Sequence, residues 1–222
     1  MKSESKPKLA IFDTFKTRSN DLTGEAKRQR AIISILGNSA NPAERTRTGI
    51  SQKIAKKQGI TWKNIYSGIF RDLDEILLPM GIAEENGRLP LKRGPKALQE
   101  KGIPYYHLTK KGVLVKLSIN GVENMSSEFK KIFAESEPNE KKFETILSKF
   151  MTNSPTFTYS IFQKYVKAFC EDKIKELLPF DLSKLQDIPD ENLIIQKEIV
   201  LAFEKLSSKE KKEAIVFLEK IT

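Results

Sequence analysis

The stretch ISQKIAKKQGITWKNIYSGIFRDL, residues Ile50–Leu73, decides the fold that this chain is expected to adopt. It predicts two helices joined at Gly59, because apolar residues recur at helical spacing on both sides of a residue type that readily ends a helix. Ser51 is the expected N-cap of the first helix, with Ile50 as the apolar residue just outside it. The open question is whether the outward side of the pair is an ordinary polar surface or one that binds a partner.

The second helix of the pair, expected from Thr61 to Ile76, has two different faces. At about 100° per residue, one arc collects apolar side chains that should face the core: Trp62, Ile65, Ile69, Leu73 and Ile76. The opposite face is centred on Lys63, Asn64, Ser67 and Arg71, and carboxylates follow only from Asp72 onward. Because Arg and Lys suit guanine, Asn suits adenine and Ser suits either, this face is a candidate for reading bases in the DNA major groove. The alternative is an ordinary polar helix face.

Cations around the first helix are the expected phosphate contacts. The set comprises Arg45, Arg47 and Thr48, expected just before the helix, and Lys53, Lys56 and Lys57, expected on it. Such contacts set affinity and register without reading the sequence of bases. Solubility explains any single lysine equally well. The interpretation as phosphate contacts therefore depends on the clustering of these residues.

A long basic loop between two short strand-like pieces is the second expected site. GIAEE (Gly81–Glu85) and PYYHLT (Pro104–Thr109) predict a hairpin, and the loop tip KRGPK spans Lys92–Lys96. An arginine on a tight Gly-Pro turn can enter a narrow minor groove. We therefore expect Arg93 in the minor groove, Lys92 and Lys96 on phosphates, and Arg88 in a lesser role. A mobile basic loop without specific contacts is the alternative.

These features together resemble the winged helix-turn-helix family of DNA-binding transcription regulators. Ala55, Gly59 and Ile65 stand four and then six residues apart, which is the family's spacing for the helix contact, the turn and the apolar anchor. The likeness extends over about Glu25–Leu117, where YYHLTKKG is similar to a second wing strand that leads into a helix. The sequence departs from the family at Gly68, where an apolar residue is usual, so the packing of the second helix is in question.

The distribution of charge divides the chain into two parts. The 222 residues carry a formal net charge of +10. Residues 1–120 hold 23 Lys and Arg against 11 Asp and Glu, and residues 121–222 hold 16 against 18. The expected organisation is a flexible basic segment over residues 1–20, a winged helix-turn-helix domain of three helices plus a β-hairpin wing over 21–120, and an all-α helical accessory domain over 121–222. The predicted fold class is therefore mainly α.

The second half predicts five helices separated by Pro or Asn-Ser-Pro breaks, at 126–136, 139–151, 156–178, 191–206 and 207–221. Ser207 and Glu210 form a capping-box pattern at the start of the last one. This closing pair is similar to terminal helices through which some winged-helix regulators dimerise, so a homodimer is expected. The aromatic residues between Phe157 and Phe169 are interpreted as helix core rather than an effector pocket, and Cys170 as a buried thiol.

The sequence favours binding over catalysis. His107 is the only histidine, and a single histidine disfavours His-based catalytic triads and rules out metal sites built from several histidines. The phosphate-binding motifs GxxxxGK[ST] and GxGxxG do not occur. We expect no enzyme activity and no cofactor. The chain has no apolar run long enough to span a bilayer, and its first residues lack the apolar core of a signal peptide, so a cytoplasmic protein without membrane contact is expected.

Three functions remain open at this point. The first is a sequence-specific regulator that binds double-stranded DNA, whose dimer would read half-sites about one helical turn apart. The second is a nucleic-acid-binding factor of chromatin, replication or RNA metabolism with little sequence preference. The third is a winged-helix scaffold for protein interaction, in which the basic face is incidental.

Overall fold

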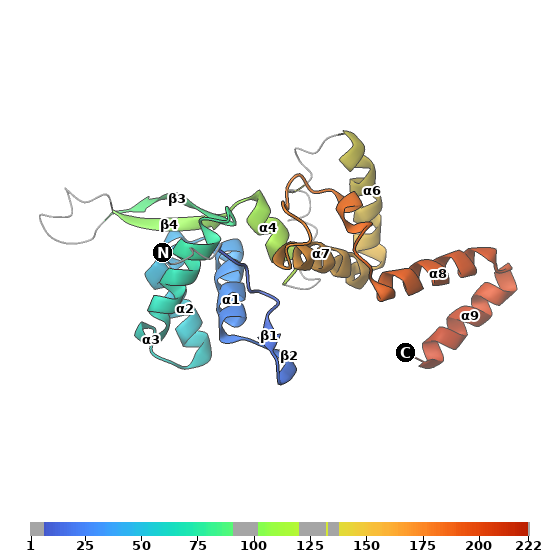
Figure 1. The fold of residues 1–222 in the computed structure, drawn as a ribbon, viewed down its shortest axis with the longest axis horizontal. Coiled ribbons are helices and arrows are strands. Elements are labelled where there is room, and N and C mark those ends of the chain that lie inside the picture. Colours follow the sequence, from blue (N-terminus) through green and yellow to red (C-terminus); the bar gives the residue numbers. More distant parts are fainter. Residues whose placement is uncertain (1–6, 91–101, 120–131, 133–137, 222) are drawn as a thin grey trace, which may run out of the picture. The chain divides into compact units, whose positions relative to one another are not determined.

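The computed structural model describes residues 7–90, 102–119, 132 and 138–221, and it is mainly helical with two small antiparallel hairpins (Figure 1). The chain separates into two compact units, Met1–Leu182 and Ser183–Thr222. The division expected near residue 120 therefore lies inside the first unit, where helix α4 (Lys110–Leu117) packs on helix α7 (Pro155–Cys170). Within the described residues, no helix has the length and apolar character needed to cross a membrane.

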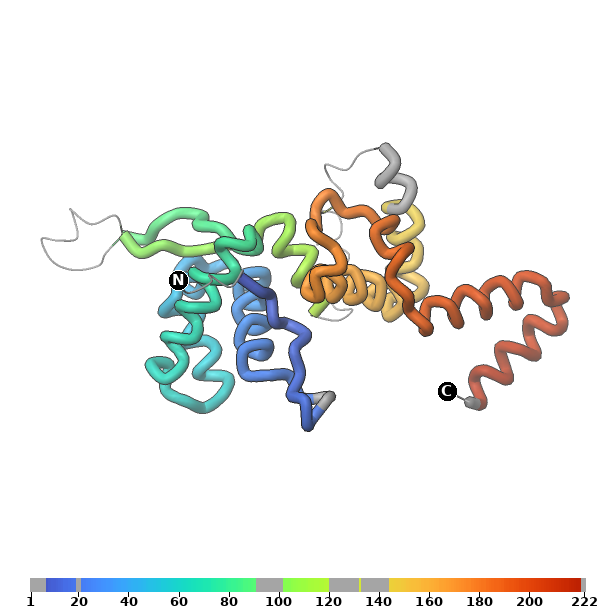
Figure 2. Tube along the Cα trace, in the orientation of Figure 1, coloured from blue at the N-terminus to red at the C-terminus, as the bar shows by residue number. Residues whose placement is uncertain are grey.

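The first unit contains three helices that pack on one another: α1 (Gly24–Asn38), α2 (Arg47–Gln58) and α3 (Lys63–Arg71) (Figures 1 and 2). A short 3-10 helix, η1 (Pro42–Arg45), joins α1 to α2. The core between them consists of fully buried aliphatic side chains, among them Ile32, Ile33, Ile50, Ile69 and Leu73. The expected order of three helices is confirmed.

Helix α2 begins five residues earlier than the sequence predicted. Thr46 is its N-cap, since its side-chain oxygen accepts a hydrogen bond from the Gly49 amide at 3.0 Å. Ser51 lies inside the helix, where its hydroxyl is buried and donates to the Arg47 carbonyl at 2.8 Å. The prediction that Ser51 is the N-cap was wrong, because Thr46 takes that role. The Thr46 hydroxyl also donates a hydrogen bond to the Ala43 carbonyl.

The turn between α2 and α3 forms at the predicted glycine. Gly59 adopts a left-handed conformation with φ 67°, and its amide and that of Ile60 both point back to the Ala55 carbonyl. A residue with a side chain is strained in that conformation, so the glycine fixes where α2 ends.

The helix expected over residues 61–76 is two segments in the structure. Regular α3 ends at Arg71 and continues as a π-helical segment, η2 (Asp72–Leu77), in which the Leu78 amide bonds to the Leu73 carbonyl. Leu73 and Leu77 of this segment are both fully buried. Nothing in the period of the sequence distinguishes this π segment from continued α-helix.

A β-hairpin of strands β3 (Ala83–Leu89) and β4 (Ile103–Leu108) follows, with Ala83 opposite Leu108 and Leu89 opposite Ile103. Thr46 adds an antiparallel bridge to Tyr105, on the other side of β4 from β3. The chain then enters α4 (Lys110–Leu117), which Thr109 caps. The predicted strand pieces and the following helix are confirmed.

The expectation of a flexible segment over residues 1–20 is wrong for residues 9–11. Leu9, Ala10 and Ile11 are buried against α1, where the Gln29 side chain accepts from the Ala10 amide at 2.8 Å. A small hairpin of β1 (Thr14–Phe15) and β2 (Arg18–Leu22) follows. The apolar run LAIF (Leu9–Phe12) indicates a buried segment, but the polar residues around it suggested a flexible one.

Helices α6 (Pro138–Asn153) and α7 (Pro155–Cys170) complete the first unit. The predicted helix over 156–178 is too long, because the chain leaves α7 through a turn at Asp172, whose φ is 58°. The segment after it folds back and buries Ile174, Leu177 and Phe180. Phe162 and Tyr165 are fully buried there, which confirms the prediction of aromatic core. The helix predicted at 126–136 lies outside the described residues except for Ile132.

The second unit, reached through a 3-10 turn η4 (Leu182–Leu185), contains α8 (Glu191–Lys205) and α9 (Ser208–Ile221). The capping box at the start of α9 is confirmed: the Ser207 amide donates to Glu210 at 2.8 Å, and the Glu210 amide donates to the Ser207 hydroxyl at 3.4 Å.

Candidate nucleic-acid interface

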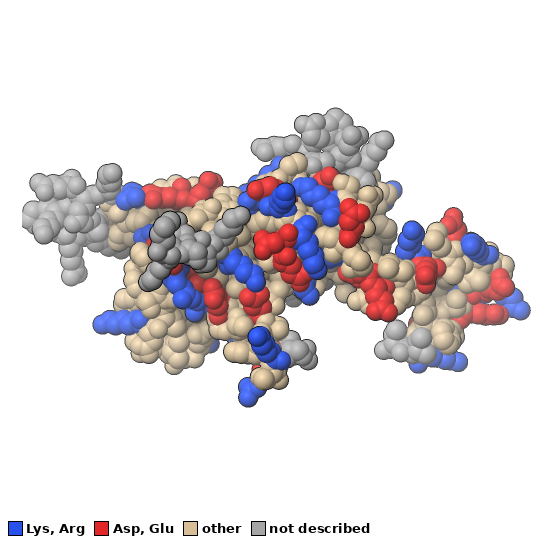
Figure 3. All heavy atoms as spheres, viewed as in Figure 1, with Lys and Arg blue, Asp and Glu red and all other residues tan. Residues whose placement is uncertain are grey.

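The outward face of α3 carries the side chains that the sequence analysis placed there. Lys63, Asn64, Ser67 and Arg71 are all exposed, while Ile69 beneath them is fully buried. Figure 3 shows cationic side chains projecting from the α2–α3 pair. Because no Asp or Glu occurs between Glu44 and Asp72, this helix pair adds no carboxylate of its own to the exposed face.

Gly68 is the point at which α1 crosses α3 closely. A β-carbon at Gly68 would lie 3.0 Å from the guanidinium carbon of Arg28, a residue of α1. Arg28 passes over Gly68 to bind Asp72 through two nitrogens, Nε and Nη2, the second at 3.1 Å from Oδ1. Asp72 is fully buried, so its carboxylate depends on this partner. The glycine at this position therefore has a local cause: the Arg28 side chain occupies the space that a larger side chain would need.

Arg71 is less available than its exposure suggests. One of its terminal nitrogens lies 3.9 Å from a Glu25 oxygen and 3.9 Å from an Asp72 oxygen. Its side chain is 52% exposed, so solvent screens both pairs. The guanidinium can reorient toward a polyanion at small cost.

The lysines of α2 differ in their partners. Lys53 binds Glu44 and donates to the Ser39 hydroxyl at 2.8 Å, and its hydrogen bond lowers the pKa of the Glu44 carboxyl. Lys56 and Lys57 are exposed and have no ion pair among the described residues; the same holds for Lys63 on α3. These three ammonium groups are the cations of the helix pair that are open to a phosphate.

Arg47, an expected phosphate contact, is bound within the protein. Its guanidinium donates to Asp74 from both Nε and Nη2, the latter at 2.7 Å, and lies over the Phe70 and Tyr106 rings at 5.0 and 5.3 Å. Burial alone would lower the pKa of Arg47, but the hydrogen bonds to Asp74 and the charge interactions with Tyr106, Asp74 and Tyr66 together outweigh it and raise the pKa. Arg47 thus ties the start of α2 to the end of α3 and to β4.

Three other predicted contacts lie close to the hairpin or the start of α2. Arg45 stacks on the Tyr105 ring at 5.3 Å, and its Nε atom is buried without a hydrogen-bond partner in the described part of the chain. Thr48 is half-buried in the first turn of α2. Arg88 donates to Glu85, with Nε at 2.6 Å from the carboxylate, on the same strand β3. The loop-tip residues Lys92, Arg93 and Lys96 lie outside the described residues.

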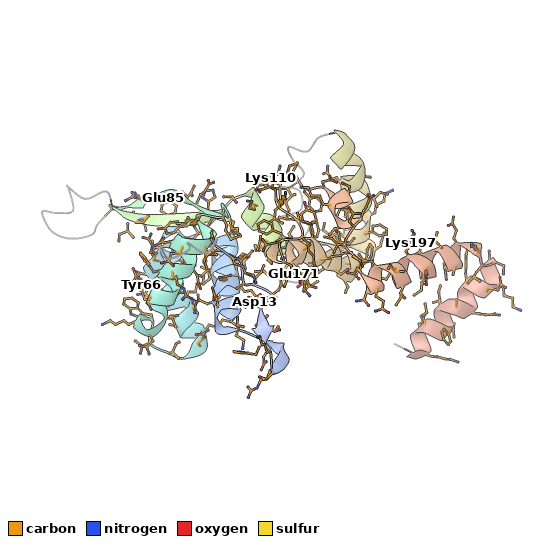
Figure 4. All side chains as sticks on the ribbon, in the orientation of Figure 1. Asp13, Tyr66, Glu85, Lys110, Glu171 and Lys197 are labelled. Carbon is orange, nitrogen blue, oxygen red and sulfur yellow. The ribbon has the colours of Figure 1, made fainter. Side chains whose placement is uncertain are left out.

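Aromatic side chains next to the basic face were not predicted as part of it. Phe70 is 45% exposed, and Trp62 and Tyr66 are half-buried with their rings 5.7 Å apart in an edge-to-face contact. Tyr66 is labelled on α3 in Figure 4. The three aromatic residues follow one another at intervals of four residues, which the sequence shows. The sequence analysis placed Trp62 in the core and gave no role to Tyr66 or Phe70.

The described part of the chain assembles no cluster of metal ligands. No group of three His, Cys, Asp or Glu side chains there is placed to hold a metal ion. His107 pairs its Nε2 with Glu84 at 3.0 Å across the β3–β4 hairpin. Lys173 binds Glu171 at 2.6 Å on the surface.

Comparison of the chain with protein-family models, with curated proteins and with solved structures finds no match in any of the three. The residues and their geometry therefore carry the functional argument alone.

Proposed function

We propose that this chain is a winged helix-turn-helix protein that binds double-stranded DNA and acts as a transcription regulator. The order of three helices, hairpin and helix supports this proposal, and so does the bridge from Thr46 to Tyr105. That bridge sets a third extended segment, from the α1–α2 connection, beside β4. The bridge therefore ties the hairpin to the residue that caps α2.

The observation that carries the proposal is the basic surface of the α2–α3 pair. Lys56, Lys57 and Lys63 are exposed on it, are unpaired within the described residues, and have no carboxylate in the sequence between them. A solvated surface of a small domain normally mixes charges of both signs. A one-signed surface on a helix-turn-helix suits a polyanion, because neutralised phosphates release their counterions.

The proposed contacts are refined by the geometry. Lys63, Asn64 and Ser67 read base edges from α3, and Arg71 joins them after leaving Glu25. Lys56 and Lys57 contact phosphates, together with Thr48 and, after exchange of its partner, Lys53. Arg47 serves instead to position α3 through Asp74. The loop tip with Lys92, Arg93 and Lys96 keeps its proposed place in the minor groove or on phosphates.

A second candidate function, binding of nucleic acid with little sequence preference, is favoured by one specific observation. The cations left open on the helix pair are lysines, whereas each described arginine nearby has an acidic or aromatic partner. Lysine presents a point charge, and it lacks the planar fork with which arginine recognises guanine. Such a surface can hold phosphates strongly while discriminating bases weakly.

Selection of bound fragments from random DNA, followed by competition at fixed salt, tests these proposals. A regulator should prefer its selected site over bulk DNA by at least about 1000-fold. Asn64→Ala and Ser67→Ala should each reduce that preference by roughly 5- to 100-fold and leave bulk binding unchanged. Equal affinity for both DNAs would support the second candidate, and absence of binding at moderate salt would overturn both in favour of a protein-interaction scaffold.

A further inference from the structure

Phe70 is a large apolar side chain that α3 exposes beside its polar residues. It is 45% exposed, whereas Ile69, the residue before it, is fully buried in the core. A single exposed apolar residue is normal on a protein surface. Its position and its neighbours therefore decide whether Phe70 has a role.

The position of Phe70 is on the outward face of α3, in one row with Lys63. The two residues are seven apart in the sequence, so they differ in direction by only about 20° around the helix axis. Asn64 and Arg71 form the neighbouring row at the same spacing, and Ser67 lies between the two rows. The face that is proposed to read bases therefore contains an aromatic ring among its polar side chains.

Arg47 holds the Phe70 ring in place. Its guanidinium carbon lies 5.0 Å from the centre of the Phe70 ring. The same guanidinium is fixed by hydrogen bonds to Asp74 and lies 5.3 Å from the centre of the Tyr106 ring. A side chain that is already held in this way loses little conformational freedom when it binds a partner. The exposed part of the ring is thus a preorganised apolar contact.

The cations that share this surface with Phe70 favour DNA over a protein as its partner. Lys56, Lys57 and Lys63 are exposed on the same helix pair and have no ion pair among the described residues. A protein interface takes about 20–30 residues from each side and is apolar at its centre. Here the two aromatic residues that precede Phe70 on α3 are half-buried, so the exposed apolar area is close to that of one ring.

Thymine is the base that such a ring can recognise in the major groove. Among the four bases, thymine alone places a methyl group there, and an apolar side chain such as Phe contacts it without a hydrogen bond. Ser67 lies three residues before Phe70, close enough on a helix for both side chains to meet neighbouring bases. Its hydroxyl can donate to the O4 atom of thymine or bind another base edge.

We propose that Phe70 recognises the 5-methyl group of a thymine, with the Ser67 hydroxyl on a base edge beside it. The inference rests on the proposed binding of α3 in the major groove, and it adds the base that this helix prefers. Apolar readout also gives sequence preference to a surface whose open cations, being lysines, discriminate bases weakly.

Replacement of thymine by uracil tests the inference from the DNA side, because uracil pairs in the same way and lacks only the methyl group. The full chain selects its site from random duplexes, and each thymine of that site is then replaced by uracil in turn. Loss of the buried methyl group should weaken binding by roughly 3- to 10-fold at one or two positions. A site without thymine, or equal affinity at every position, would overturn the inference and leave the proposed function standing. Recovery of no site would overturn both.

A protein variant then assigns the effect to Phe70. The Phe70→Ala variant should bind the thymine and uracil sites equally. Phe15→Ala, which removes a 47% exposed ring from β1, is the matched control and should keep the full difference. Each comparison is between two DNAs on one protein, so it does not depend on equal stability of the variants. An effect of uracil on DNA shape would persist without the ring, so a difference that survives in Phe70→Ala would refute the assignment.

Discussion

At the scale of single residues, Gly68 is the position at which this chain departs from its expected pattern, and Arg28 is the reason. The Arg28 guanidinium occupies the surface of α3 above Gly68 and continues to the fully buried carboxylate of Asp72. The sequence shows the glycine but not its neighbour, because Arg28 and Asp72 are 44 residues apart.

Arg28→Ala should lower the free energy of unfolding by about 3 kcal/mol, since it leaves the Asp72 carboxylate buried without its main partner. Chemical denaturation measures the change. Arg71→Ala is the control: this neighbour is 52% exposed and 3.9 Å from Asp72, so its loss should cost less than about 1 kcal/mol. Equal costs for the two variants would show that the Arg28 pair is not what holds α3 to α1.

Gly68→Ala should have opposite effects in two backgrounds. In an open helix, alanine in place of glycine gains about 1 kcal/mol. Here the new methyl group meets the anchored Arg28 side chain, so the substitution should destabilise the wild-type chain and stabilise the Arg28→Ala variant. Denaturation of the four chains gives both changes. Stabilisation by Gly68→Ala in both backgrounds would contradict the close crossing.

Cys170 should be an inert thiol whose burial makes stability sensitive to high pH. Burial raises its pKa from 9.0 to about 12, so above pH 9 the unfolded thiol ionises while the folded thiol stays neutral. The free energy of unfolding should therefore fall between pH 9 and 12, and Cys170→Val should remove that part of the fall. Denaturation of both chains at pH 8 and 10.5 measures it; an identical pH dependence would exclude the buried thiol as its source.

At the scale of elements, the sequence predicted existence and order better than boundaries. The glycine turn, both strands of β3–β4 and the capping box of α9 carry local signals, and the structure has them where expected. The start of α2 and the end of α7 were misplaced, because they depend on contacts that are distant in sequence. Thr46 is both a helix cap and a partner of Tyr105, and the residues after Cys170 leave the helix to cover Tyr165.

Thr46→Ala should destabilise the chain by about 1–2 kcal/mol, because the Gly49 amide and the Ala43 carbonyl both lose their side-chain partner. Thr48→Ala, two residues later and without a side-chain hydrogen bond to the described residues, is the matched control and should change stability by less than about 0.5 kcal/mol. Thermal and chemical denaturation compare the two, and a larger loss at Thr48 would place the helix start elsewhere.

At the scale of the whole molecule, the distribution of charge indicated that the chain has two parts, but it did not locate the boundary between the two units. The basic surface of α2 and α3 belongs to residues 1–182, and the exposed apolar side chains of α8 and α9 belong to residues 183–222. Composition placed the boundary near residue 120, because the excess of basic residues ends there and the last arginine is Arg93. Packing placed it later, since α7 contacts α4 and buries Phe162 and Tyr165 within the first unit.

The sequence also identified the exposed face of α3 but not which cations would be open. Period alone placed Lys63, Asn64, Ser67 and Arg71 outward, and the structure exposes all four. Arg47 pairs with Asp74, which lies 27 residues later in the chain, so no local pattern predicts this ion pair.

The salt dependence of DNA binding tests the central claim most directly. The full chain carrying Lys56→Glu, Lys57→Glu and Lys63→Glu is compared with a control carrying Lys16→Glu, Lys149→Glu and Lys175→Glu, three exposed lysines away from α2 and α3. Both variants change the net charge equally. If the α2–α3 surface binds phosphates, the first variant should bind at least about 100-fold more weakly, with a slope of log K against log salt that is shallower by about 2–3, while the control keeps the wild-type slope. Equal slopes and affinities for the two variants would contradict the assignment of this surface to DNA.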